Sequence, residues 1–157
     1  MGQFSFKSAG KTQEQRLVET LERAATPIGI KTPLALNMGE GNDILQTYDN
    51  LADCVHDNLR NLLLTNWGSR LGLYKFGANL RPLMAELVSP DDFDSKAIEN
   101  ISDAVNRWMP FVSLETFESN VNRTDVRKLA RIDVKITYNV PTLNVKNKML
   151  EINLYAM

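Results

Sequence analysis

The sequence has little of what disulfide-stabilised, catalytic and membrane proteins depend on. It holds one cysteine, Cys54, so no disulfide can form within the chain, and one histidine, His56. No apolar run approaches the roughly 20 residues needed to cross a bilayer, and the segment 1–11 lacks the apolar middle of a signal peptide. We therefore expect a protein that is made and assembled in the cytoplasm and has no membrane partner.

An excess of charge of either sign is also absent. Eighteen basic and nineteen acidic residues give a net charge of -1, which argues against a strongly basic nucleic-acid-binding protein. One local basic cluster has two interpretations, a solvated strand end or a surface that meets an acidic partner. It consists of Arg123, Arg127, Lys128 and Arg131. The length of 157 residues and the hydrophobic fraction of 43% allow a core of ordinary size.

Groups that could carry catalysis or hold a metal are sparse. Cys54 and His56 are two positions apart on a predicted helix, so their side chains point in different directions and cannot form a catalytic pair. Too few cysteines and histidines exist for an ordinary zinc site. Four carboxylates beside Pro90 could serve hydrolysis, but such a run is more typical of a solvated turn that caps a helix. They are Glu86, Asp91, Asp92 and Asp94. We expect no catalytic residue, metal or cofactor.

Apolar residues at helical spacing predict four helices. The strongest covers residues 49–65, where Asp49 or Asn50 can cap the start. The others are expected at 13–25, at 79–87, and from Asp94 or Ser95 to Trp108. The segment 28–42 holds Pro33 and three glycines and is interpreted as a connector with a short edge strand at 34–36.

The C-terminal third changes to a period of two, which is typical of half-buried strands. Alternating apolar residues run over 130–138 and 150–154, and residues 111–117 are rich in strand-forming side chains. Three such segments in a row predict an antiparallel meander. We therefore predict an α+β fold with N-terminal helices followed by a small antiparallel C-terminal sheet. Residues 1–48 are expected to form an arm, a helix and a connector, and residues 49–157 the main domain.

The segment 66–80 concentrates glycines and aromatic residues. We expect the rings of Trp67, Tyr74 and Phe76 to wrap this loop onto the core, with glycines permitting tight turns. Arg70 is expected to hold the loop by donating hydrogen bonds to the carbonyls that end the preceding helix, and a contact with a partner is the alternative.

The order of motifs from Leu62 onward is similar to that of a known family. A helix ends in Thr65, a Gly-x-Arg loop and a Phe-Gly pair follow, and a leucine-rich helix comes next. These motifs read Leu63-Leu64-Thr65, Gly68-Ser69-Arg70, Phe76-Gly77 and Leu80-Arg81-Pro82-Leu83. A further helix, a proline-centred tripeptide and two closing strands complete the pattern. Residues 49–157 thus resemble the lysozyme-like baseplate wedge, or sheath-initiator, family of contractile phage tails, which is related to a type VI secretion baseplate component.

The resemblance implies a structural wedge subunit of the virion's tail baseplate, without enzymatic activity, assembled in the host bacterial cytoplasm. Its implied partners are the tail sheath protein and the baseplate wedge core proteins, with the tail tube as a further candidate. In the family a Glu-Pro-Arg tripeptide helps dock the subunit on the wedge core. Here Trp108 is followed by Met109, Pro110 and Phe111, so this contact is either lost or apolar.

Family members present a strand to the sheath, and a C-terminal strand over 148–156 could do so here. Its free backbone groups would pair with a partner strand, and its candidate contact residues are Leu150, Ile152, Leu154 and Tyr155. The strand could instead be central in its sheet, or covered by the N-terminal arm. Two other functions stay open: a peptidoglycan-cleaving enzyme that uses Glu86 or Asp92, and a generic adaptor that binds through the helix 13–25.

Overall fold

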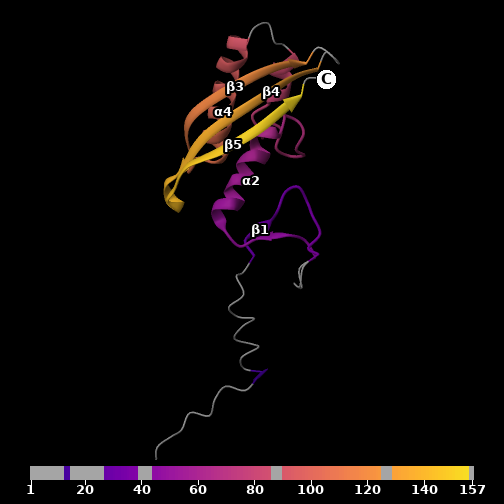
Figure 1. Cartoon of the computed structure of the whole chain (residues 1–157), viewed down its shortest axis with the longest axis vertical. Coiled ribbons are helices and arrows are strands. Elements are labelled where there is room, and N and C mark those ends of the chain that lie inside the picture. Colours follow the sequence, from indigo (N-terminus) through magenta and orange to yellow (C-terminus); the bar gives the residue numbers. More distant parts are fainter. Residues whose placement is uncertain (1–12, 15–26, 39–43, 86–89, 125–128, 156–157) are drawn as a thin grey trace, which may run out of the picture.

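The computed structural model describes residues 13–14, 27–38, 44–85, 90–124 and 129–155, so most of the helix expected at 13–25 lies outside the described residues. In chain order, two short strands precede three helices and three long strands, with a 3-10 turn (Pro141–Leu143) before the last (Figure 1). The elements are β1 (Gly29–Ile30), β2 (Thr47–Tyr48), α2 (Leu51–Leu64), α3 (Leu80–Ala85), α4 (Pro90–Trp108), β3 (Ser113–Thr124), β4 (Leu129–Val140) and β5 (Val145–Tyr155).

The predicted order of helices first and strands afterwards is wrong. In the described part of the chain, the helices lie between an N-terminal antiparallel pair, β1–β2, and the antiparallel sheet β3–β4–β5. The expected C-terminal sheet is present. The strands β1 and β2 have two residues each, too few to show an alternating pattern, and the strand expected at 34–36 is a single bridge between Leu36 and Leu45.

The β1–β2 pair is attached to α2 by a polar cluster around Asp57. The Asp57 carboxylate accepts hydrogen bonds from the Tyr48 hydroxyl, from the Thr32 amide at 3.3 Å and from the Thr32 hydroxyl at 3.2 Å. Asn61 donates from its side chain to the same Thr32 hydroxyl at 3.0 Å. Side chains one turn apart on α2 therefore hold the preceding strands against the helix.

The helix α2 follows its sequence signals closely. The Asn50 side chain accepts a hydrogen bond from the Ala52 amide at 3.0 Å, so Asn50 is the N-cap. Four of the five residues of the predicted stripe are buried, namely Val55, Leu59, Leu62 and Leu63, whereas Leu51 is 44% exposed. This burial makes α2 the helix on which the rest of the core packs.

The helix α4 starts earlier than predicted. It begins at Pro90, where the sequence suggested a turn, because a proline in the first turn loses no helical hydrogen bond. The spacing predicted a buried stripe of Ile98, Ile101, Val105 and Trp108. Ile98 is instead 45% exposed, and Phe93, Ala97 and Ala104 join Ile101 and Val105 in the core. None of the described helices is long and apolar enough to cross a membrane.

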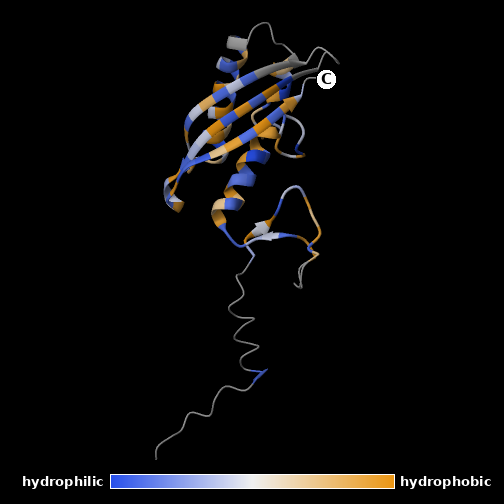
Figure 2. Cartoon of the chain, in the orientation of Figure 1, coloured by the Kyte–Doolittle hydropathy of each residue, from blue (hydrophilic) through white to orange (hydrophobic). Residues whose placement is uncertain are grey.

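The C-terminal sheet is the predicted antiparallel meander, in the order β3–β4–β5. One face is covered by the helices, and Figure 2 shows the resulting alternation of apolar and polar residues along the strands. The register pairs Val134 with Ile152 and Ile136 with Leu150, so both strands turn their apolar residues inward. The opposite face is polar and carries a Lys135–Glu151 ion pair at 3.1 Å. The fold therefore has two layers, with β5 at one edge of the sheet.

Candidate functional site

The first candidate site is the free edge of β5. Among the described residues β5 pairs only with β4. In an antiparallel sheet, alternate residues of an edge strand direct their N–H and C=O groups away from the neighbouring strand. Over Val145–Tyr155 this leaves a row of backbone donors and acceptors that a further strand could pair with.

The side chains predicted as contacts on β5 lie on different faces. Leu150, Ile152 and Leu154 are 2%, 2% and 8% exposed and pack in the core, so they cannot themselves meet a partner. Tyr155 is 51% exposed on the opposite face. Contact through β5 would therefore rest on its backbone and its outward side chains.

A hollow of about 210 Å³ lies beside the end of β5. It is bounded by Leu154 and Tyr155 of β5, by Leu63 and Leu64 of α2, and by residues of α3. The α3 residues are Leu80, Arg81 and Met84. The inward side chain of a strand added next to Leu154 would project toward this hollow.

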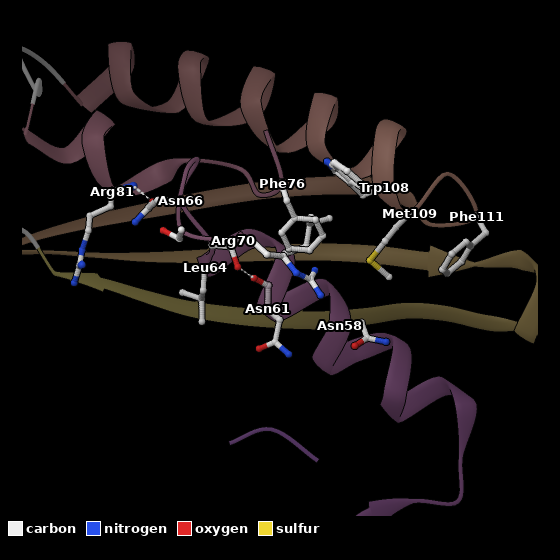
Figure 3. A pocket seen from close by; sticks show the side chains of 13 residues that line it. Asn58, Asn61, Leu64, Asn66, Arg70, Phe76, Arg81, Trp108, Met109 and Phe111 are labelled. Atoms are coloured by element: carbon white, nitrogen blue, oxygen red, sulfur yellow. Dashed lines mark hydrogen bonds between the residues drawn. The ribbon is translucent and has the colours of Figure 1, made fainter. Parts of the chain in front are cut away.

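The second candidate site is a groove of about 780 Å³, which we call the arginine groove (Figure 3). Its walls come from α2, the loop 66–79, the start of α3 and the segment after α4. It is lined by Asn58, Asn61, Leu62, Leu64, Thr65, Asn66, Ser69, Arg70, Phe76, Arg81, Trp108, Met109 and Phe111. Three of the four residues of the segment 108–111, which was predicted to dock on the wedge core, therefore line one groove. The fourth, Pro110, is exposed but does not line it.

The groove wall depends on how the loop 66–79 returns to α2. The amides of Ala78 and Asn79 donate to the carbonyls of Leu62 and Thr65, both at 3.3 Å. Gly77 makes this return possible: its φ is +110°, and a Cβ there would lie 2.1 Å from the Thr65 carbonyl oxygen. The Phe-Gly pair quoted from the sequence is thus a point of close backbone contact.

The aromatic residues of the loop do not all face inward as predicted. Phe76 packs edge-to-face on Trp108, with ring centroids 5.1 Å apart, and Trp67 donates from its indole to the Gly77 carbonyl at 3.0 Å. Tyr74, however, is 71% exposed and Leu71 is fully exposed. The paired Phe76 and Trp108 rings fix the groove wall, and the outer tip of the loop faces solvent.

Arg70 has a different role from the one expected. Its guanidinium lies 4.4 Å from the centroid of the Phe76 ring, in cation–π geometry. The carbonyls that Arg70 was expected to bind receive the amides of Ala78 and Asn79 instead. Stacking on a fixed ring keeps the Arg70 charge at the groove, where Arg81 adds a second positive charge.

The residues considered for catalysis are separated or engaged in the described part of the chain. The Asp94 carboxylate accepts a hydrogen bond from the Ser119 hydroxyl, which ties α4 to β3, and Glu86 lies outside the described residues. The His56 Nδ1 lies 2.8 Å from the Tyr138 hydroxyl. Burial lowers the pKa of His56, and the charge of Lys148 lowers it further. The described residues hold no group of three or more histidine, cysteine, aspartate or glutamate side chains that could bind a metal.

Sequence comparison alone finds no relative: no family model and no curated protein matches the chain. The structure is similar to a chain of the anti-feeding prophage baseplate, with a TM-score of 0.57 and 15% sequence identity, over 77% of this chain and 90% of that one. This chain has the fold of a baseplate subunit. The resemblance to the lysozyme-like baseplate family, expected from the sequence, is confirmed at the level of the fold.

Two further solved structures are similar at 15% identity. A Geobacter sulfurreducens protein named "putative tail lysozyme" aligns over 70% of this chain and 93% of its own, with a TM-score of 0.48. A chain of the baseplate complex of the type VI secretion system aligns over 68% of this chain and 93% of its own, with a TM-score of 0.43.

Proposed function

We propose that this chain is a structural subunit of the tail baseplate of a contractile phage-type particle, which docks on the wedge core and starts sheath polymerisation by strand addition. The observation that carries the proposal is the edge strand β5 in a fold shared with an anti-feeding prophage baseplate chain. In this proposal residues 49–157 are the docking domain and residues 1–48 are an added arm. The chain acts without catalysis, on the virion, after assembly in the host cytoplasm.

Strand addition is supported by the geometry of the β5 edge. Main-chain hydrogen bonds would supply the affinity, and alternate side chains of the incoming strand would supply the register. The hollow beside Leu154 gives one inward side chain of the incoming strand a place to pack. The outward residues Glu151 and Tyr155 border the new strand on the other face.

Docking on the wedge core is assigned to the segment 108–111. The family's charged Glu-Pro-Arg tripeptide is replaced by Met109, Pro110 and Phe111, and Phe111 is 42% exposed. The contact in this protein therefore has an apolar component, supplied by residues of the arginine groove.

Hydrogen exchange of β5 in the presence of the cognate sheath protein tests strand addition. In the free chain, alternate β5 amides should exchange rapidly because they face outward, and the others should be protected by β4. Adding sheath protein should slow the exchange of the outward set. Deleting β5 is not a suitable test, because Leu150, Ile152 and Leu154 belong to the core.

The strand β3 is the internal control, because it forms the opposite edge of the same sheet. Its amides should exchange at the same rate with and without sheath protein. Protection that appears at β3 and not at β5, or at neither edge, would mean that sheath polymerisation does not start by pairing with β5.

A further inference from the structure

The arginine groove has different chemistry at its two ends. Figure 3 shows Arg81 at one end, Arg70 and Phe76 in the middle, and Met109 and Phe111 toward the other end. A ligand that fits it must therefore combine negative charge with apolar surface in an elongated shape.

The two arginine charges in the groove are not balanced by a carboxylate among the described residues. Arg70 and Arg81 line it, no aspartate or glutamate does, and neither guanidinium pairs with a carboxylate among the described residues. Arg70 is exposed and stacks on Phe76, so part of its side-chain freedom is already lost before it binds an anion. A carboxylate suits such a guanidinium, since two parallel hydrogen bonds can form between them.

The apolar part of the groove contains side chains that a partner could cover. Phe111 is 42% exposed, Trp108 is half-buried against Phe76, and Met109 is buried at 7% exposure. Asn58 and Asn61, on the α2 side of the groove, have amide oxygens of the kind that accept hydrogen bonds from peptide N–H groups, while their NH2 groups donate to the Cys54 sulfur at 3.6 Å and to the Thr32 hydroxyl at 3.0 Å. Amides beside an apolar wall favour an extended peptide over a compact ligand, and about 780 Å³ is ample for one.

We propose that the arginine groove binds an extended peptide segment of a baseplate partner, whose acidic residues lie at Arg70 and Arg81 and whose apolar residues lie at Trp108 and Phe111. The inference deepens the docking role proposed for 108–111 and rests on it. A nucleic-acid strand fits less well, because two arginines beside an apolar wall would neutralise few phosphates.

Peptide binding by the purified full-length chain tests the proposal. Two fluorescein-labelled peptides of about eight residues serve as probes. Half of each peptide is leucine and phenylalanine. The other half is aspartate and glutamate in the acidic peptide and lysine in the basic peptide. The acidic peptide should bind at least about tenfold more tightly by fluorescence polarisation, and its affinity should fall as salt is raised.

Substitutions assign the effect to the groove. Arg70→Gln and Arg81→Gln should each weaken acidic-peptide binding roughly tenfold. Phe111→Ser should weaken it through the apolar half. Arg60→Gln is the matched control, because Arg60 is an exposed arginine of α2 that does not line the groove. Circular dichroism of each variant verifies that the fold is retained.

Three results would overturn the proposal: equal binding of the acidic and basic peptides, an Arg60→Gln effect as large as that of Arg70→Gln, or tighter binding of a single-stranded oligonucleotide. The sheath-dependent protection of β5 is measured separately. If the unaltered chain does not bind the acidic peptide but its β5 amides are protected by sheath protein, the groove proposal alone is rejected, and the reverse outcome rejects the sheath role alone.

Discussion

Replacing Gly77 by alanine should destabilise the protein far more than the same change at Gly72. Both glycines have positive φ, +110° at Gly77 and +78° at Gly72. They differ in their surroundings: a Cβ at position 72 has no atom within 4 Å, whereas at position 77 it lies 2.1 Å from the Thr65 carbonyl oxygen. Contacts of Cβ atoms below 3.0 Å essentially never occur, so the loop and α2 must separate by about 0.9 Å.

The expected cost follows from what that separation breaks. Placing a side chain in the positive-φ region lowers the free energy of unfolding by roughly 1–3 kcal/mol. Alanine also restricts the unfolded chain, which raises the free energy of unfolding by about 0.4–1 kcal/mol. At Gly72 these two effects together lower the free energy of unfolding by about 1 kcal/mol. At Gly77 the hydrogen bonds from Ala78 and Asn79 to the end of α2 are also strained, at about 1 kcal/mol each. The loss at Gly77 should therefore reach about 3 kcal/mol.

Thermal and urea denaturation measure this difference. For a chain of this size, about 3 kcal/mol lowers Tm by roughly 6–12 °C, and about 1 kcal/mol by roughly 2–4 °C. Comparable losses in Gly72→Ala and Gly77→Ala would refute the reasoning, since they would show that the contact with Thr65 does not limit position 77.

Three further predictions address other parts of the molecule. Because burial lowers the pKa of His56 from its ordinary value of 6.5, the native chain binds the proton less readily than the unfolded chain. The contribution of neutral His56 to the free energy of unfolding is therefore fully present above about pH 6.5 and is lost as pH falls through the lower native pKa. The His56→Gln variant should lack this pH-dependent contribution, which denaturation curves between about pH 5 and 7 would measure. Asp57→Ala should weaken the attachment of β1–β2 to α2 by about 2 kcal/mol. The amide of Ile28 should then exchange roughly 30-fold faster, while the exchange of β4 amides is unchanged. Equal acceleration in both would contradict a domain boundary near residue 48. The purified chain should not cleave peptidoglycan, and any turnover that Asp92→Asn abolishes would reject the structural role.

The parts of the fold that could be predicted from the sequence are those with long regular periods. The α2 stripe and the alternation around Val134 and Ile152 each extend over several repeats, so their type and buried face are correct. The β1–β2 pair has no such repeat and depends on hydrogen bonds to Asp57, which are contacts between distant residues. The start of α4 was missed because Pro90 suits both a turn and a first helical turn.

In the candidate sites, too, features that follow from a sequence pattern were predicted and features that depend on contacts between distant residues were not. The segment 108–111 was identified from motif order, and Trp108 and two residues of the tripeptide, Met109 and Phe111, line one groove. The stacking of Arg70 on Phe76 could not be predicted, because it depends on the close return of Gly77 to α2, a contact that spacing does not reveal. Leu150, Ile152 and Leu154 were grouped as contact residues because a strand pattern gives an apolar face without saying what covers it.

The two candidate surfaces share residues, and this decides which variants can separate their roles. Leu64, Asn66 and Arg81 line both the arginine groove and the hollow beside β5, so a change at Arg81 can affect either. Arg70 lines the groove but not the hollow, and Glu151 of β5 lines neither. Arg70→Gln should therefore weaken acidic-peptide binding without changing sheath-dependent protection of β5. If Arg70→Gln reduced both, the groove and the edge would act as one binding surface, and α2, which contributes residues to the groove and the hollow, would be the element that joins them.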